Sequence, residues 1–204
     1  MGIDVGGSGF RIGVFDTMSG ELIGPLHQHR HGVSTGPTDV LDAICEAIER
    51  LQWEGPIGLG FPGAVEANRP ITAPNLGEEW VDVDVSKHLM AFHGGRFVML
   101  NDADAVALGE AQHGVGHGGA ACVLTLTIGT GLCTSVHRDG SLVPNLEYGR
   151  LPHPTRGGCL EEHLSGRART QENLSLDAWA MRFQEGLTHL EHRLQPDRII
   201  LYGG

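Results

Sequence analysis

Two stretches of this chain share one pattern, and this repeat restricts the fold more than any other feature of the sequence. Residues 3–23 (IDVGGSGFRIGVFDTMSGELI) and residues 126–143 (LTIGTGLCTSVHRDGSLV) have the same order of elements. Each reads as a strand, a glycine-rich bend with a hydroxyl residue, a second strand, an acidic turn and a third strand. Chance is a poor explanation for two such copies in one chain. We therefore expect two equivalent hairpins, one in each half of the molecule.

Each glycine-rich bend has the composition of a phosphate-binding loop. Gly6, Gly7 and Gly9 leave the backbone N–H groups of the first bend uncovered, and Ser8 adds a hydroxyl. Convergent N–H dipoles of this kind form a nest for an anion. Asp4 would lie beside that anion, which requires a cation such as Mg²⁺ or a transferring group between them. An ordinary glycine hairpin explains the first bend alone, but the second copy favours two loops that hold two ends of a phosphate chain.

Strands and helices alternate along the rest of the chain, which is typical of an α/β fold. Residues 38–52 repeat apolar side chains at helical spacing, and Thr38 or Asp39 is the expected N-cap. The patterns also predict helices over 86–94, 103–114, 160–164 and 176–194, a strand over 57–65 that breaks at Pro62 and Gly63, strands over 96–100 and 197–204, and irregular chain over the rest of 144–169. We expect two lobes, 1–100 and 101–204, with an active-site cleft between them.

Charge and apolar content exclude several classes of partner. A formal net charge of −11 argues against nucleic acid, and no apolar run is long enough to span a membrane. With 40% apolar residues, the chain can bury a real core. Its cysteines are Cys45, Cys122, Cys133 and Cys159, with no C-x-x-C spacing. We interpret them as reduced thiols of a cytoplasmic protein.

Asp102 is the strongest candidate for a catalytic group. It follows an apolar strand and opens a helix (VMLNDADAVALGEA), the place where α/β folds position reactive groups. A carboxylate there can accept the proton of a hydroxyl that attacks phosphorus. The alternative is that Asp102 or Asp104 only caps the helix. Two phosphate loops in the same chain favour the catalytic base.

The ordered motifs resemble those of the ROK sugar kinases, which share the ribonuclease H-like fold class of actin and the Hsp70 ATPase. The matching stretches are IDVGGSG, GLGFPGAV, APNLGEEW, LNDADAVALGEAQHG, LTIGTG, DGSLVPNLEYG and LSLDAWAMRFQEGLTHLEHRLQPDRIILYGG. They extend over nearly the whole chain. The words VPNLE and LSLDAWA favour the polyphosphate-dependent glucokinase branch of that family.

The resemblance implies a role for each matching residue. The first phosphate motif matches Asp4, Gly6, Gly7 and Ser8, and the second matches Gly129, Thr130 and Gly131. Asp102 matches the catalytic base. The sugar ligands match Asn75, Asn101, Asp102 and Glu147, and Glu161 matches a sugar-contacting glutamate of zinc-bearing members. Gly203 and Gly204 match the start of the adenosine or distal phosphate motif, and Asp4 is the candidate ligand for Mg²⁺.

The sequence departs from the family pattern in several places. Cys133 stands where a glycine is usual, and Arg150 stands where the family has a sugar-contacting histidine. We still expect Arg150 on the sugar side, because it follows Glu147 in the family's order. The chain stops at Gly204, within the last glycine motif, so we expect a C-terminally truncated form of the fold whose activity needs testing.

The family's structural zinc is not expected here. Many ROK proteins hold that zinc with a histidine and several cysteines. This chain keeps only Cys159 of that cluster, with His153 and His163 nearby in sequence. One cysteine and two scattered histidines fall short of a tetrahedral set.

The motifs together predict a homodimeric kinase that moves a phosphoryl group from polyphosphate or ATP to the 6-hydroxyl of glucose, with Mg²⁺. One alternative is an ATP-dependent kinase for another hexose or an N-acetylhexosamine. Another is an inactive sugar-binding or regulatory ROK protein. Four arginines in one irregular stretch, Arg150, Arg156, Arg167 and Arg169, can line a polyphosphate path, although loop arginines are more often simply solvated.

Overall fold

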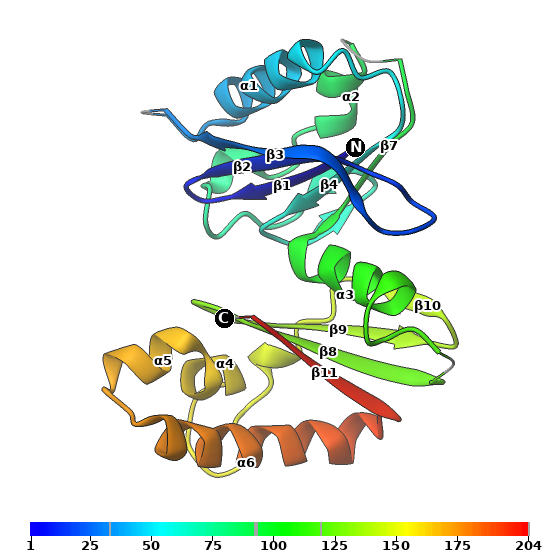
Figure 1. Ribbon diagram of the computed structural model, residues 1–204. Helices are drawn as coiled ribbons and strands as arrows, with labels where there is room; N and C mark the ends of the chain where they lie inside the picture. The colour runs from blue at the N-terminus through cyan, green and yellow to red at the C-terminus, as the bar shows by residue number, and fades with distance from the viewer. Residues whose placement is uncertain (33, 92–93, 119, 204) are drawn as a thin grey trace. The chain divides into compact units, whose positions relative to one another are not determined.

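The chain forms two units, each with its own sheet and its own core (Figure 1). The computed structural model describes residues 1–32, 34–91, 94–118 and 120–203. The first unit is Met1–Ala105 and the second is Val106–Gly204. Helix α3 (Asp102–His113) begins in the first unit and continues in the second. None of the helices in the described ranges is long and apolar enough to cross a membrane.

The first unit is a mixed sheet in the order β3-β2-β1-β4-β7. Its strands are β1 (Gly2–Gly6), β2 (Gly9–Phe15), β3 (Leu22–Arg30), β4 (Ile57–Phe61) and β7 (Phe97–Asn101). Strands β1, β2 and β3 form the antiparallel hairpins expected from the first repeat, while β4 and β7 run parallel to β1. The carboxyl ends of β1, β4 and β7 therefore meet at one edge of the sheet.

Helices α1 (Pro37–Arg50) and α2 (Val85–Met90) cover one face of this sheet (Figure 1). Ile3 of β1, Leu59 of β4 and Met99 of β7 belong to the core on that face. Because side chains alternate along a strand, the even-numbered residues of these strands face the other way. On β1 and β4 these residues are glycines and one aspartate (Gly2, Asp4, Gly6, Gly58 and Gly60), so β1 and β4 place few side chains on this glycine-rich face.

Helix α1 begins earlier than the sequence pattern predicts. Gly36 is its N-cap, without a side-chain hydrogen bond, and Pro37 occupies the first turn. The fixed φ of proline suits that position, so neither Thr38 nor Asp39 acts as the cap. The segment before α2 contains β5 (Val65–Glu66), β6 (Arg69–Pro70) and the 3₁₀ helix η1 (Glu78–Trp80). The buried Trp80 anchors this segment by donating to the Thr35 carbonyl over 2.8 Å.

The second unit has a sheet in the order β10-β9-β8-β11. Its strands are β8 (Cys122–Ile128), β9 (Leu132–Arg138), β10 (Ser141–Val143) and β11 (Arg198–Gly203). Strands β8, β9 and β10 form antiparallel hairpins as the second repeat predicts, and β11 runs parallel to β8. The two repeats therefore have the same strand topology, one in each unit.

Helices α4 (Leu160–Leu164), α5 (Gly166–Gln171) and α6 (Leu176–Leu194) follow β10 along the chain. Leu160 and Leu164 of α4 pack with Leu190 of α6 and with Leu124 and Leu126 of the sheet. The sequence pattern located α4 and α6 but left α5 inside the stretch expected to be irregular. Its N-cap is Ser165, whose hydroxyl accepts from the Ala168 N–H over 3.2 Å. The 3₁₀ helix η2 (Tyr148–Arg150) precedes α4.

Candidate active site

Two carboxylates lie on the glycine-rich face of the first unit's sheet. Asp4 of β1 is in register with Gly60 of β4, and Gly60 with Leu100 of β7. Asp102 follows Leu100 by two residues. A side chain at Gly60 would place its Cβ 3.6 Å from the Asp102 Cα. Gly60 is buried, and its lack of a side chain lets the start of helix α3 with Asp102 pack closely against β4.

Asn101, not Asp102, caps helix α3. The Asn101 Oδ1 accepts from the N–H groups of Ala103, at 3.0 Å, and Asp104, at 3.1 Å. Its amide donates to the Gly63 carbonyl over 3.1 Å, which fixes the side chain. The Asp102 Oδ1 accepts only from the neighbouring Ala103 N–H, at 2.8 Å, among the hydrogen bonds of the described residues. Asn101 therefore provides most of the capping that the alternative interpretation assigned to Asp102 or Asp104.

The environment of Asp102 raises its pKa to about 6. Burial is the largest cause, because it disfavours the charged carboxylate. The negative charges of Asp4 and Asp104 raise the pKa further, while the hydrogen bond from Ala103 lowers it. A carboxylate whose pKa is close to neutral can take up a proton and release it at physiological pH. This is the property that a general base needs.

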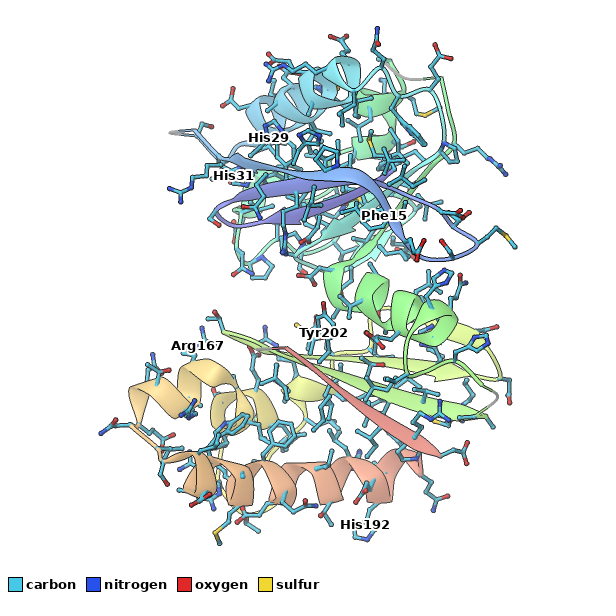
Figure 2. The ribbon with its side chains drawn as sticks, viewed as in Figure 1. Phe15, His29, His31, Arg167, His192 and Tyr202 are labelled. Atoms are coloured by element: carbon cyan, nitrogen blue, oxygen red, sulfur yellow. The ribbon has the colours of Figure 1, made fainter. Side chains whose placement is uncertain are left out.

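The first glycine turn has unused backbone donors. No acceptor among the described residues takes the N–H of Gly7 or Ser8. The Gly6 carbonyl accepts from the ring of His31, one residue after β3, over 2.8 Å (Figure 2). A Cβ at Gly7 would lie 3.0 Å from the Asn75 carbonyl oxygen. The structure thus brings the predicted sugar ligand Asn75 against the predicted phosphate turn.

Asp4 has a partner that the sequence reasoning missed. Its Oδ2 accepts from the Arg11 guanidinium, through Nε at 3.0 Å and through a terminal nitrogen. Arg11 lies opposite Asp4 in the β1–β2 register. Such pairs stabilise a hairpin, and they also neutralise a carboxylate. The second oxygen of Asp4 is left for a cation.

The second glycine turn is held by helix α5. The N–H groups of Gly166 and Arg167 donate to the carbonyls of Gly129, at 2.9 Å, and Thr130, at 3.3 Å. The N–H groups of Thr130 and Gly131 have no acceptor in the described part of the chain. Both glycine turns therefore present two consecutive N–H groups that the protein itself does not use.

Beside this turn lies a cluster of opposite charges, Glu147, Arg150, Glu161 and Arg167. The Arg150 Nε is 3.5 Å from the Glu147 carboxylate and 3.8 Å from the Glu161 carboxylate. A terminal nitrogen of Arg167 is 3.7 Å from the other Glu161 oxygen. The Thr134 hydroxyl fixes the segment of Glu147, because it donates to the Leu146 carbonyl and accepts from the Tyr148 N–H. The predicted sugar-side residues of the second unit are thus in mutual contact.

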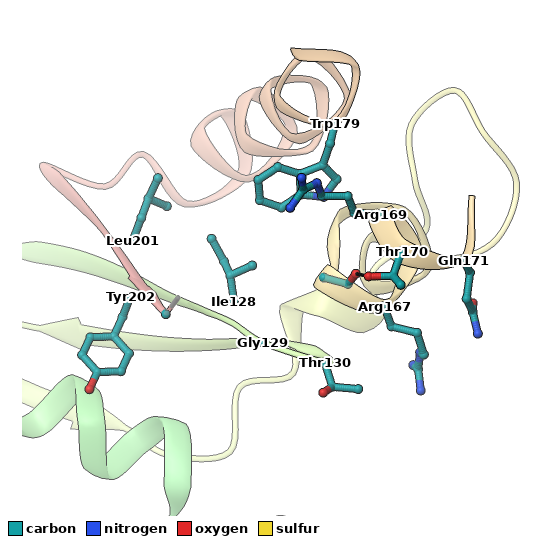
Figure 3. Close-up of a pocket in the computed structure, with 12 residues that line it drawn as sticks. Ile128, Gly129, Thr130, Arg167, Arg169, Thr170, Gln171, Trp179, Leu201 and Tyr202 are labelled. Carbon is teal, nitrogen blue, oxygen red and sulfur yellow. Dashed lines mark hydrogen bonds between the residues drawn. The ribbon is translucent and has the colours of Figure 1, made fainter. Parts of the chain in front are cut away.

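A cavity of about 910 Å³ opens next to the second turn (Figure 3). Its lining residues are Ile128, Gly129, Thr130, Gly166, Arg167, Arg169, Thr170, Gln171, Trp179, Leu201, Tyr202 and Gly203. They include two arginines and no carboxylate, in a chain with a formal net charge of −11. An anion is the ligand that such a lining favours. Gly203 lies here as expected, whereas its predicted neighbour Gly204 is outside the described residues.

The loop that carries His153, Cys159 and His163 is held by hydrogen bonds and a ring contact. His153 is buried, and its Nδ1 accepts from the N–H groups of Thr155, at 3.3 Å, and Arg156, at 3.2 Å. The His163 ring packs against it edge-on and donates to the Gly157 carbonyl over 2.7 Å. No group of three or more potential metal ligands occurs among the described residues. Arg156 pairs with Glu185 through two bonds of 3.0 Å and does not line the cavity.

Comparison with known proteins identifies the family. The model of the ROK family matches residues 1–183. The chain belongs to the ROK family. It is 34% identical over 204 residues to a polyphosphate glucokinase of Mycobacterium tuberculosis, of which it covers 76%, and 32% identical over 186 residues to a glucokinase of Streptomyces coelicolor, of which it covers 56%.

Solved ROK structures have the same fold. An inorganic polyphosphate/ATP-glucomannokinase from Arthrobacter superposes with a TM-score of 0.87 at 32% identity, over all of this chain and 82% of that one. A ROK glucokinase from Streptomyces griseus, solved with glucose and AMPPNP, superposes with a TM-score of 0.76 at 24% identity. The predicted fold class of the sugar kinases is confirmed by these comparisons.

Proposed function

We propose that this ROK protein transfers a phosphoryl group from polyphosphate, or from ATP, to the 6-hydroxyl of glucose. Its similarity to polyphosphate glucokinases and to a polyphosphate/ATP-glucomannokinase supports both the sugar and the donor. The observation that carries the proposal is Asp102, which lies at the start of helix α3 beside Gly60 of β4, with a pKa raised to about 6. In this role Asp102 accepts the hydroxyl proton as the sugar oxygen attacks phosphorus.

We assign the other site residues the roles that the resemblance to ROK kinases implies. The free N–H groups of the two glycine turns hold donor phosphates. Asn75, Asn101, Glu147, Arg150 and Glu161 position the sugar, whose hydroxyls suit amide, carboxylate and guanidinium partners. The cavity beside Gly129 and Thr130 takes the rest of the donor, because its lining carries positive charge without a carboxylate.

We propose that Mg²⁺ binds together with the phosphoryl donor. The ion binds proteins through one or two carboxylates and completes its shell with phosphate oxygens and waters, which neutralise charge during transfer. Asp4 fits that use, because the Arg11 pair occupies only one of its oxygens. A cytoplasmic location and a homodimer complete the proposal, and size-exclusion chromatography with light scattering tests the latter.

A donor comparison tests the reaction. The chain is incubated with glucose, Mg²⁺ and either inorganic polyphosphate or ATP, and glucose 6-phosphate is measured through a coupled dehydrogenase. Product with polyphosphate supports the proposal, and the ratio of the two kcat/KM values gives the donor preference. Product from ATP with another hexose or an N-acetylhexosamine, and none with glucose, would establish the alternative kinase. Glucose binding without any product would establish a sugar-binding protein.

A further inference from the structure

Two arginines from different parts of the second unit, Arg150 and Arg167, contact the carboxylate of Glu161. Only 19% of its side chain is exposed, and its two oxygens face Arg150, at 3.8 Å, and Arg167, at 3.7 Å. Arg150 also contacts Glu147, on the side that the proposed function gives to the sugar. Arg167 lines the donor cavity. Glu161 therefore connects two sites within the second unit.

The backbone of Arg167 is fixed, while its side chain is not. Its N–H is bonded to the Thr130 carbonyl, so its Cα keeps one position relative to the second glycine turn. Its side chain is 52% exposed and contacts Glu161 at the outer limit of an ion pair. Figure 3 shows this side chain beside Thr130 at the rim of the cavity. The Arg167 guanidinium can therefore bind either the Glu161 carboxylate or an anion in the cavity.

Arg169 provides an internal comparison. It comes from the same helix α5 and lines the same cavity. Its guanidinium has no ion pair with any of the described residues, so it is not connected to Glu161. Two arginines thus face one cavity, and only one of them is linked to the sugar side.

We propose that Arg167 is a positioning residue that couples occupation of the donor cavity to the sugar site through Glu161. This inference rests on the proposed function for the identity of the two ligands. Phosphate binds a guanidinium through two charge-assisted hydrogen bonds, which a loosely held carboxylate at 3.7 Å does not match. A bound donor phosphate therefore draws Arg167 away from Glu161.

The sign of the coupling follows from the charge left behind. Once Arg167 turns to the phosphate, the mostly buried Glu161 keeps Arg150 as its remaining cation in the cluster. A buried carboxylate that loses a partner gains from a new hydrogen bond, and a sugar hydroxyl can donate one. Donor binding therefore strengthens sugar binding. Because coupling free energies are reciprocal, sugar binding strengthens donor binding by the same factor.

Equilibrium binding tests this coupling without turnover. The probes are 6-deoxyglucose, which lacks the accepting hydroxyl, and inorganic tripolyphosphate with Mg²⁺. Calorimetry measures the Kd of 6-deoxyglucose in the absence of tripolyphosphate and at saturation. For the unaltered chain we expect saturation to tighten the sugar by roughly 5-fold or more, the lower end of typical coupling. Arg167→Gln should reduce this factor to nearly one.

Matched variants separate coupling from a general loss of charge. Arg169→Gln should weaken tripolyphosphate but keep the coupling factor at saturation. Glu161→Gln should remove the coupling, and adding Arg167→Gln to it should change the factor no further. Arg156→Gln, which breaks an ion pair outside the cavity, should leave both Kd values unchanged.

Each result decides one question. Equal coupling factors in Arg167→Gln and Arg169→Gln, or no coupling in the unaltered chain, would overturn the inference. If the chain then still phosphorylates glucose, the proposed function stands alone. If coupling depends on Arg167 but no glucose 6-phosphate forms, the coupled sites stand and the proposed reaction fails.

Discussion

The two glycine turns have the same strand topology but differ in what their glycines are needed for. In the first turn, a Cβ at Gly9 would lie 2.0 Å from the His29 carbonyl, and one at Gly7 would lie 3.0 Å from the Asn75 carbonyl. In the second turn, a Cβ at Gly129 would meet nothing within 4 Å. The first turn thus needs glycine to let backbones approach, whereas the fold does not require glycine at Gly129.

The charges beside the two turns differ as well. The first unit carries two carboxylates, Asp4 and Asp102, on one face of its sheet, and Asp4 is paired with Arg11. The second turn lies beside a mixed cluster of carboxylates and guanidinium groups, and the cavity next to this turn is lined by Arg167 and Arg169 without a carboxylate. The two copies of the motif therefore differ: one has a carboxylate-bearing face beside it, and the other has an arginine-lined cavity. Proton transfer fits the first and anion binding fits the second. The sequence repeat predicts the shared strand topology, but most of the groups that distinguish the two turns, Asp102, Arg167 and Arg169, lie outside the repeat.

Of the substitutions considered, replacing the Asp102 carboxylate should have the largest effect on activity. Asp102→Asn should lower kcat by on the order of 10²–10⁴, the usual contribution of a general base. The same variant should be more stable at pH 7 by up to about 3 kcal/mol, because a pKa raised to about 6 means that the folded state disfavours the charge. Urea unfolding at pH 7 measures the second effect. A kcat within a few fold of the unaltered chain would exclude Asp102 as the base.

Acidification probes the same carboxylate in the unaltered chain. The proposed base works when deprotonated, so kcat/KM should fall about tenfold per pH unit below about pH 6. The stability term has the opposite sign. With a folded pKa above the unfolded value, Asp102 contributes stability at low pH, and this contribution is lost as pH rises from about 4 through about 6. A kcat/KM profile that stays flat down to pH 5 would assign the base elsewhere.

A pair of alanine variants tests the contrast between the turns directly. Gly9→Ala should destabilise the chain by about 1–3 kcal/mol, because the His29 carbonyl belongs to the backbone and cannot move aside freely. Gly129→Ala should leave stability unchanged and raise the KM for polyphosphate, since its methyl group projects where the donor is expected to bind. Thermal unfolding and donor titration measure the two effects. If both variants unfold at the same temperature, the fold does not need glycine at position 9 more than at position 129.

The smallest effect on activity is expected for Arg150, in the charged cluster of the second unit. This residue contacts Glu147 and Glu161, so Arg150→His should change the KM for glucose by a few fold. The dependence on polyphosphate should stay as it was, at low salt as well as at high salt, if Arg150 faces the sugar. An unaltered glucose KM together with weaker polyphosphate binding at low salt would move Arg150 to the donor path.

Local patterns were sufficient to predict most elements of the fold. The alternation in residues 57–61 and the helical spacing in 176–194 each depend on neighbours in the sequence, and β4 and α6 are where these patterns place them. Helix α5 was missed because six residues are too few to reveal a helical period. The cap of α3 was also uncertain, because Asn101, Asp102 and Asp104 are all good capping residues and the choice depends on backbone angles.

The contacts of the candidate site are harder to predict than its residue types. The pairing of Arg11 with Asp4 depends on the register of β1 and β2, and that of Arg167 with Glu161 depends on how α5 packs on the glycine turn. Neither arginine belongs to a recognisable motif. The raised pKa of Asp102 also has its cause in burial, which a single sequence does not report.

The alternating glycines of β4 give two positions that look identical in the sequence but lie in different environments. A Cβ at Gly58 would have open space around it, while one at Gly60 would make only ordinary contacts, at 3.6 Å with Asp102 and 3.8 Å with Ala105. Folding alone therefore permits alanine at both positions. In a codon-randomised library sorted once for expression and once for growth on phosphorylated sugar, alanine at position 60 should survive the first sort and disappear in the second. Such a record would show whether the substrate needs the space that one added methyl group would fill at position 60.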